Sequence, residues 1–390
     1  MRRLGIAMVA TATATAFGMA WHPSVSAQAA APVVQFMAPL SSGPTSGGPA
    51  GENQSITPAT VDQEPMPAAA DRPANLPLPI ERVCDIVGQG LQTFYPGPAG
   101  SALYDQLFKP TFAIPYLADK YTPQGMAVWP RWFNDGGSLV IIGMYSKGHD
   151  SYLVGVDPAN GAVYGTIRVL EAHLGGLAVV GDWLFAQDQA QWGGESVRKY
   201  RLVDLAAAFE QSHTDASKPY VKRWGGTQPV YNASFMSSYN GHLWAGHHGG
   251  QVDKMYEYSV SSDGVLTQVG DPWEVPGFTD GLVVTADRFL FISHNSDGDK
   301  PGFVTVTAKN HHLTDGPGQC FGAPSLGEGA VLDNGQVLVV YESGSYRFAK
   351  SANKVTHMHE APYASLSAMA DPSGDSGMSE RTGQGPSTAQ

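Results

Sequence analysis

Hydrophobic and polar positions follow a pattern that recurs along the chain. A short apolar run, a turn signal and a second apolar run follow one another several times between residues 124 and 342. In four of these units a small residue is followed thirteen positions later by a histidine or a carboxylate: Gly175 by Asp188, Ser234 by His247, Gly281 by His294, and Gly329 by Glu342. Such a repeat predicts how the chain folds, and it also places four reactive side chains at one equivalent position.

The units recur about every 50 residues, beginning near Gln124, Gly175, Ala233, Asp280 and Glu328. Short strands repeated at this period indicate the blades of a β-propeller rather than a helical solenoid. We therefore predict an all-β fold, a β-propeller of five four-stranded antiparallel blades. The stretch 83–120 is the candidate source of a sixth blade.

Local signals within the units agree with this fold. Asn240-Gly241 and Asn334-Gly335 each separate two apolar runs, as in a hairpin whose type I′ turn needs positive φ at both central residues. One helix is expected over 203–211, which is rich in Ala and has no turn former. A closed ring also needs a seal between first and last blade. We expect either an N-terminal strand that joins unit five or a Cys84–Cys320 bond.

The two ends of the chain differ in composition from the repeats. Residues 1–29 are predicted to be a signal peptide, because Arg2 and Arg3 precede an apolar stretch and small residues follow it. That stretch is too short for a membrane span. Segments 30–81 and 366–390 are rich in Ala, Pro, Gly and Ser, a composition that predicts a disordered linker and a disordered tail. The propeller domain is predicted over 82–365.

Charge and cysteine content narrow the choice of partners. The chain has 23 basic and 35 acidic residues, a net charge of −12, which argues against nucleic acid and anionic membranes as partners. In an exported protein, the two cysteines, Cys84 and Cys320, are expected to form a disulfide bond. We expect a secreted, extracellular monomer.

Polar residues gather where the repeat predicts one end of the propeller axis. There, the start of each inner strand and the end of each second strand are neighbours. The predicted ligand-binding residues at these positions are Gln124, Asp188, His247, Asp280, His294, Glu328 and Glu342. Four of them are the predicted metal ligands: Asp188, His247, His294 and Glu342. Histidine suits zinc, and carboxylates suit calcium or magnesium, so a divalent cation is the candidate cofactor.

Two alternatives stand beside a metal site. The same groups can serve as general acid and base, and strand ends at a channel mouth can be polar simply because they are hydrated. His247 and His248 are adjacent, and neighbouring residues on a strand point to opposite faces. The pair is therefore not expected to bind one ion together.

Three inner-strand motifs carry a resemblance to known proteins. They are Pro123-Gln124-Gly125-Met126-Ala127, Gly175-Gly176-Leu177-Ala178-Val179 and Gly327-Glu328-Gly329-Ala330. Over about residues 125–360 the chain resembles secreted bacterial β-propeller proteins. A distant analogy connects it with lactonase-type and arabinan-cleaving propellers, which place acidic residues and a metal at the channel mouth. Their catalytic motifs are not recognisable here, so the resemblance implies a fold and no catalytic role.

The function predicted from these observations is binding. The rim at the channel mouth would bind a carbohydrate, a small molecule or an extracellular protein, with a bound cation as part of the site. The alternative is a metal-assisted hydrolase or lyase that uses the same residues. The sequence has no GxSxG elbow, P-loop, dinucleotide fingerprint or HExxH motif, so serine-nucleophile and nucleotide chemistry have no support.

Overall fold

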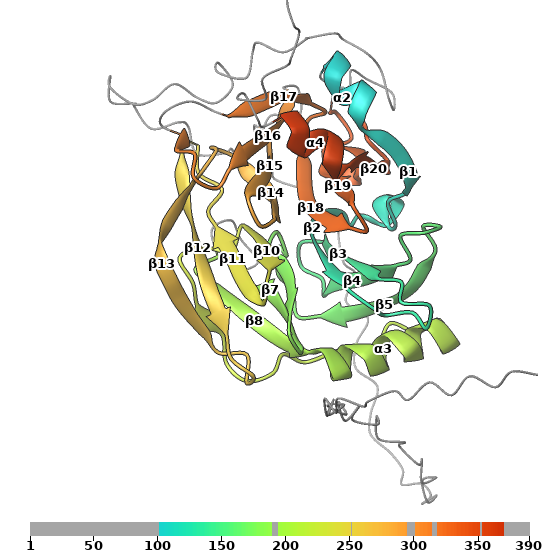
Figure 1. Ribbon diagram of the computed structural model, residues 1–390. Coiled ribbons are helices and arrows are strands. Elements are labelled where there is room, and N and C mark those ends of the chain that lie inside the picture. The colour runs from blue at the N-terminus through green and yellow to red at the C-terminus, as the bar shows by residue number, and fades with distance from the viewer. Residues whose placement is uncertain are drawn as a thin grey trace, which may run out of the picture. The chain divides into compact units, whose positions relative to one another are not determined.

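The computed structural model describes residues 101–188, 194–250, 252–294, 301–313, 318–351 and 353–369, all within one compact unit, Asp71–Gln390. Five four-stranded antiparallel sheets are arranged around a common axis, as Figure 1 shows. The predicted five-bladed β-propeller with four strands in each blade is confirmed. The described part of the stretch 83–120 contributes to the fifth blade rather than to a sixth.

In the first four blades the strands follow chain order from the axis outwards. Blades one and two consist of β2 (Thr122–Trp129), β3 (Leu139–Tyr145), β4 (Ser151–Val156), β5 (Val163–Val169), β6 (Leu177–Val180), β7 (Trp183–Gln187), β8 (Ser196–Arg201) and β9 (Gln228–Pro229). Blades three and four consist of β10 (Phe235–Tyr239), β11 (His242–Gly246), β12 (Asp253–Val260), β13 (Leu266–Val275), β14 (Thr279–Val284), β15 (Arg288–His294), β16 (Gly302–Ala308) and β17 (Gln319–Ala323).

Blade five combines strands from both ends of the propeller sequence. It consists of β18 (Gly327–Asp333), β19 (Gln336–Tyr341), β20 (His357–Pro362) and, outermost, β1 (Lys109–Ala113). β1 runs antiparallel to β20, with Lys109 opposite Glu360. Of the two predicted seals, the N-terminal strand is therefore present. Cys84 lies outside the described residues, so its bond to the buried Cys320 stays a prediction.

The inner strands form a tight ring around the axis. Successive contacts lead from β2 through β6, β10 and β14 to β18, which contacts β2 again. Glycine makes this approach possible. A Cβ on Gly281 would lie 2.4 Å from the Glu328 carbonyl oxygen, and one on Gly125 would lie 2.1 Å from the Gly175 carbonyl oxygen. Backbone thus meets backbone where the repeat places its small residues.

The Asn-Gly hairpins have the predicted geometry. Asn240 and Gly241 have φ of 50° and 77°, and Asn334 and Gly335 have φ of 46° and 78°. Both central residues of each turn are therefore left-handed, as a type I′ turn requires. These turns fix the register of the two inner strands in blades three and five.

Apolar side chains fill the space between neighbouring blades. One cluster between blades one and two includes Ile141, Leu177 and Leu184, and another between blades four and five includes Val304, Val339 and Phe321. Each fully buried side chain of this kind contributes about 1.5–3 kcal/mol. The core therefore consists of wedges between blades, and it leaves the ends of the axis for other residues.

In the described part of the chain, three α-helices cover the outside of the blades. α3 (Leu202–Asp215), predicted over 203–211, buries Leu205 and Phe209 against blade one. α2 (Ala102–Leu107) and α4 (Tyr363–Met369) lie against blades four and five. Short 3-10 turns occur at η1 (Leu117–Asp119), η3 (Glu342–Gly344) and η4 (Tyr346–Phe348). Among the described residues, no helix combines the length and apolarity needed to cross a bilayer.

The predicted domain limits are only partly visible. α4 continues beyond residue 365, where the tail was predicted to begin, because Leu366 is buried in the core between blades four and five. Segments 1–29 and 30–81 and the rest of the tail lie outside the described residues. The signal peptide, the linker and the disordered tail therefore stay predictions.

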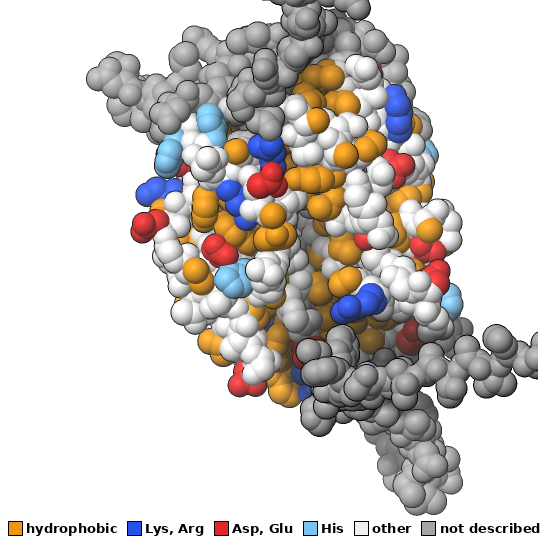
Figure 2. Space-filling model, in the orientation of Figure 1, with side chains coloured by type: hydrophobic (Ala, Val, Ile, Leu, Met, Phe, Trp, Pro, Cys, Tyr) orange, Lys and Arg blue, Asp and Glu red, His pale blue; other side chains and the backbone are white. Residues whose placement is uncertain are grey.

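On the face drawn in Figure 2, Lys and Arg side chains are interspersed with acidic and apolar ones.

Candidate functional site

Several predicted residues meet at one end of the axis. Asp280 and Glu328 lie near the starts of the inner strands β14 and β18, and His294 ends the second strand β15. Glu342 follows β19 directly, and Gln124 lies on β2. The five residues come from blades one, four and five and are all buried.

Left-handed residues fix the backbone at this end of the axis. Phe278 and Leu326, just before β14 and β18, have φ of 58° and 59°. Their carbonyl oxygens each accept a hydrogen bond at 2.9 Å, from the amides of His294 and Glu342 respectively. A bulky residue adopts positive φ only where the surroundings enforce it. The two hydrogen bonds hold the end of each second strand beside the start of its inner strand.

Asp280, His294 and Glu328 form a compact triad. His294 Nε2 lies 2.8 Å from Asp280 Oδ2 and 3.2 Å from Glu328 Oε1. One ligand atom from each residue lies within 4.8 Å of the others. The side chains are only 1%, 5% and 1% exposed for His294, Asp280 and Glu328 respectively. A single imidazole nitrogen therefore contacts two buried carboxylates.

His248 is a further member of the cluster, and the repeat register did not predict it. Its Nδ1 lies 2.8 Å from Asp280 Oδ2, and its ring centroid lies 5.7 Å from that of His294. Two imidazoles thus contact one carboxylate oxygen of Asp280. The repeat register selected His247, which is the preceding residue.

Glu342 and Gln124 extend the cluster toward blade one. Gln124 Nε2 donates a hydrogen bond to Glu342 Oε1. Glu342 Oε2 and Gln124 Oε1 are buried and accept no hydrogen bond from the described residues. A buried oxygen without a partner costs about 1–3 kcal/mol, and more when it is charged. These two atoms are therefore available to a bound water or cation.

The contacts of Asp280 with His248 and His294 determine the charge of the Asp280 carboxylate. Burial opposes ionisation of Asp280, but His248 and His294 outweigh it and hold the pKa of Asp280 below its usual range. Burial alone would lower the pKa of His294, but Asp280 and Glu328 raise it well above its usual value. Asp280 and His294 are therefore both charged at neutral pH.

The pKa values of the other two carboxyl groups, Glu328 and Glu342, are raised. Burial, with repulsion from Asp280 and Glu342, raises the pKa of Glu328 well above its usual value. Burial also raises the pKa of Glu342. Both shifts favour the protonated form of each group more than in water. The cluster therefore contains two carboxyl groups whose protons a bound cation could displace.

His173 lies nearby and was also missed. It is buried, and its ring centroid lies 5.3 Å from that of Tyr145. Burial, followed by the nearby positive charge of Arg347, lowers the pKa of His173 to about 4. His173 is therefore neutral. It precedes β6 in the connection between blades one and two, so no repeat position points to it.

Two of the four predicted metal ligands lie elsewhere. Asp188 Oδ1 is 2.7 Å from Arg198 Nε and 3.6 Å from Arg223 Nη1. His247 Nδ1 is 2.6 Å from Asp253 Oδ2, and this hydrogen bond raises the pKa of His247. β7 and β11 end before these residues, so their side chains no longer follow the alternation of a strand. Only His294 and Glu342 of that set belong to the buried cluster.

The cluster supports two kinds of chemistry. Three ligand atoms within 4.8 Å of one another can bind a divalent cation and leave coordination positions for another molecule. A carboxylate with a lowered pKa beside a carboxyl group with a raised pKa is also the arrangement of a base and an acid.

The chain matches no protein-family model and no curated protein sequence. It is similar to the PQQ-bound aldose sugar dehydrogenase of Streptomyces coelicolor, with 16% identity, coverage of 63% of this chain and 79% of that chain, and a TM-score of 0.33. It is also similar to TolB of Acinetobacter baumannii, with 10% identity, coverage of 62% and 54%, and a TM-score of 0.29. A third similar structure is the WD40 β-propeller domain of Doa1, with 10% identity, coverage of 60% and 79%, and a TM-score of 0.31. These neighbours are β-propellers, and likenesses this distant carry no argument about what the chain binds.

Proposed function

We propose that this chain is a secreted binding protein that holds a divalent cation at one end of the propeller axis. Asp280, His294 and Glu328 would be its ligands, and the cation would anchor a small molecule. The observation that carries the proposal is the buried triad, whose three ligand atoms lie within 4.8 Å of one another.

A cation would relieve an unfavourable arrangement of charge. Asp280 repels Glu328, and Glu342 adds further repulsion. Buried like charges persist only when protons, hydrogen bonds or a cation compensate them. Binding of a cation by His294 Nε2 and Glu328 Oε1 would displace the proton that each of these two groups otherwise retains. Metal binding should then release protons.

The donor set suggests how the cation would be used. Two carboxylates and one imidazole match the count of three protein ligands found in sites that keep an open position. All three side chains are buried, so an extended carbohydrate or a protein surface could not contact the cation directly. A small molecule with an oxygen or nitrogen donor is the partner that fits this burial.

Elemental analysis of the purified full chain tests the proposal. We expect about one equivalent of a divalent cation, and a lower thermal midpoint after treatment with chelator. A free cation concentration of 100 times the dissociation constant adds about 2.7 kcal/mol to the free energy of unfolding. Asp280→Asn and Glu328→Gln should each reduce the bound metal and the response to chelator.

Asp253→Asn is the matched control. Asp253 also pairs with a histidine, His247, but that pair lies outside the triad. The control should retain the metal. Absence of any divalent cation after purification in metal-supplemented buffer, together with an unchanged midpoint in chelator, would show that protons alone compensate the cluster.

A metal-assisted hydrolase or lyase is the second candidate function. The opposite pKa shifts of Asp280 and Glu328 favour it, because a base and an acid are needed in one site. Turnover of chromogenic lactones or glycosides that is lost in Glu328→Gln and kept in Asp253→Asn would support catalysis. Cation binding without turnover of either substrate class would leave binding as the function.

A further inference from the structure

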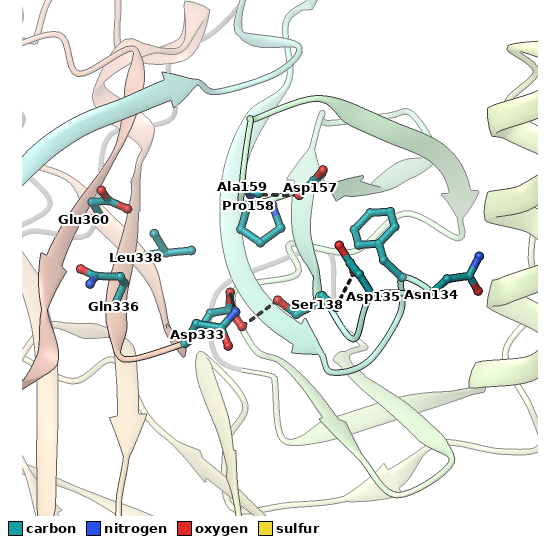
Figure 3. A pocket seen from close by; sticks show the side chains of 13 residues that line it. Asn134, Asp135, Ser138, Asp157, Pro158, Ala159, Asp333, Gln336, Leu338 and Glu360 are labelled. Carbon is teal, nitrogen blue, oxygen red and sulfur yellow. Dashed lines mark hydrogen bonds between the residues drawn. The ribbon is translucent and has the colours of Figure 1, made fainter.

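A cavity lies between the last blade and the first. Its volume is about 530 Å³, within the range of small-molecule sites. Figure 3 shows Asp333, Gln336 and Glu360 of blade five on one side, and Asp135 and Asp157 of blade one on the other. The cavity therefore lies along the seam where the ring closes.

This cavity is separate from the triad. Glu328 lies near the start of β18, whereas Asp333 ends that strand. Five residues of extended strand span on the order of 16 Å. A ligand in the cavity would therefore not contact the proposed cation, and the two sites can be tested independently.

The charge of the lining excludes anionic ligands. Among the described residues that line the cavity, every charged side chain is acidic: Asp135, Asp157, Asp333 and Glu360. The lining also includes Asn134 and Gln336. An anion such as a phosphate or a uronate would meet repulsion from several carboxylates at once. The ligand must be neutral or positively charged.

Hydrogen bonds within the protein already hold three of these carboxylates. Asp333 Oδ1 accepts from Ser138 Oγ at 2.7 Å, across the seam between the blades. Asp135 Oδ1 accepts from the Gly137 amide at 2.9 Å, and Asp157 Oδ1 accepts from the Ala159 amide at 2.9 Å. These donors partly compensate the charge and fix the orientation of each group. A carboxylate has about four lone-pair sites, so each can still accept from a hydroxyl.

Other lining residues supply apolar surface. Phe133, Pro158 and Leu338 contribute to it. A sugar ring has hydroxyls around its edge and C–H groups on its faces, so it can use oriented acceptors, amides and apolar patches together. An alkylamine would use the carboxylates but not the amides, and an apolar molecule would leave the remaining lone pairs of the carboxylates without donors.

We propose that this cavity binds a short neutral oligosaccharide. Hydroxyls of the sugar donate to Asp157, Asp333 and Glu360, and the amide of Gln336 donates to a sugar oxygen. The cavity is a second binding site, and it does not depend on a cation at the triad.

A glycan array probed with the full chain tests the assignment, followed by calorimetric titration with the best neutral glycan. The array should hold neutral, aminated and uronate-containing glycans of equal length. We expect binding to neutral glycans. Ala159→Trp, which fills the cavity from an exposed position in the turn, and Gln336→Ala should each weaken binding at least tenfold.

Matched controls separate this effect from instability. Ala207→Trp on α3 and Gln268→Ala on β13 change exposed residues that do not line the cavity, and both should bind like the parent. Chelator should not change the affinity. Thermal midpoints measured for all four variants identify any that have lost the fold.

Three results would overturn the proposal. The first is no binding to any neutral glycan at millimolar concentration. The second is binding restricted to aminated glycans and abolished by salt, which would assign the cavity to a cation. The third is neutral-glycan binding that chelator abolishes and Ala159→Trp leaves unchanged, which would place the sugar at the triad instead.

Discussion

His359 and His173 are buried histidines outside the triad whose protonation is suppressed. Burial lowers the pKa of His359 to about 3 and is the main cause that lowers the pKa of His173 to about 4. His359 Nδ1 lies 2.8 Å from Tyr104 Oη in the core beside blade five. In the unfolded chain both rings have a pKa of about 6.5. Between that pH and the lower pKa of the folded state, the unfolded chain binds more protons.

Stability should therefore fall as the pH is lowered below about 6.5. Each such histidine contributes about 1.4 kcal/mol of lost unfolding free energy per pH unit. Other groups also titrate in this pH range, so the effect of His359 is measured as the difference in unfolding free energy between the parent and a His359 variant. Urea unfolding of His359→Gln at pH 7, 6 and 5 should show a shallower decline than the parent. His213→Gln, at an exposed position of α3, should follow the parent. Parallel declines for the parent and His359→Gln would contradict the prediction.

The sequence placed the cluster more reliably than it placed each ligand. Asp280 and Glu328 lie within inner strands and His294 ends a second strand, so the repeat located all three, although the strand pairing is irregular at Asp280 and at Glu328. In blade two, the buried residue is Gln187, whose Oε1 accepts a hydrogen bond from the Gly175 amide at 3.0 Å. In blade three, His248 contacts Asp280. Each differs by one residue from the register choice, because the side-chain direction past a strand end depends on the local loop.

At the scale of elements, local signals predicted the hairpins and the inner strands. Asn-Gly turns and apolar runs act over a few residues, so the sequence alone shows them. Outer strands were less predictable. β13 is exposed along most of its length, and β9 has only two residues. An N-terminal strand was predicted only as one of two ways to close the ring, because the partner of β1, β20, is about 250 residues away in the chain.

Gly281 allows the close approach of β14 and β18. Its Cβ would lie 2.4 Å from the Glu328 carbonyl oxygen and 2.9 Å from Ile292 Cβ. Gly281→Ala should lower the unfolding free energy by about 1–3 kcal/mol, the usual cost of overpacking, as measured by urea unfolding. Gly226→Ala is the control, since a Cβ at Gly226 meets nothing within 4 Å. Equal midpoints for the two variants would show that the inner ring can expand at no cost.

At the scale of the whole molecule, the predicted Cys84–Cys320 bond would add a second seal to the ring. Cys320 lies on β17, in the blade next to the one that β1 completes. A loop of this length stabilises by about 5 kcal/mol at most in the chain-entropy model. We expect no free thiol in the native, unreduced protein, and a lower thermal midpoint after reduction. Cys84→Ser should lack this response to reductant. Titration of two thiols in the native protein would contradict the bond.

The position of β1 has a consequence for the order in which the molecule can be completed. The ribosome makes β1 before every other strand of the propeller, yet its partner β20 is the last strand made. Pairing across such a separation is slow, because a long loop must close first. Blades one to four can form as they emerge, but the fifth must wait for the end of the chain. Until then β1 is a strand without a sheet, and the growing ring has an unpaired edge that invites misassembly. If the chain crosses a membrane from its N-terminus, the pairing of β1 with β20 would take place on the far side of that membrane, after nearly all of the protein has crossed.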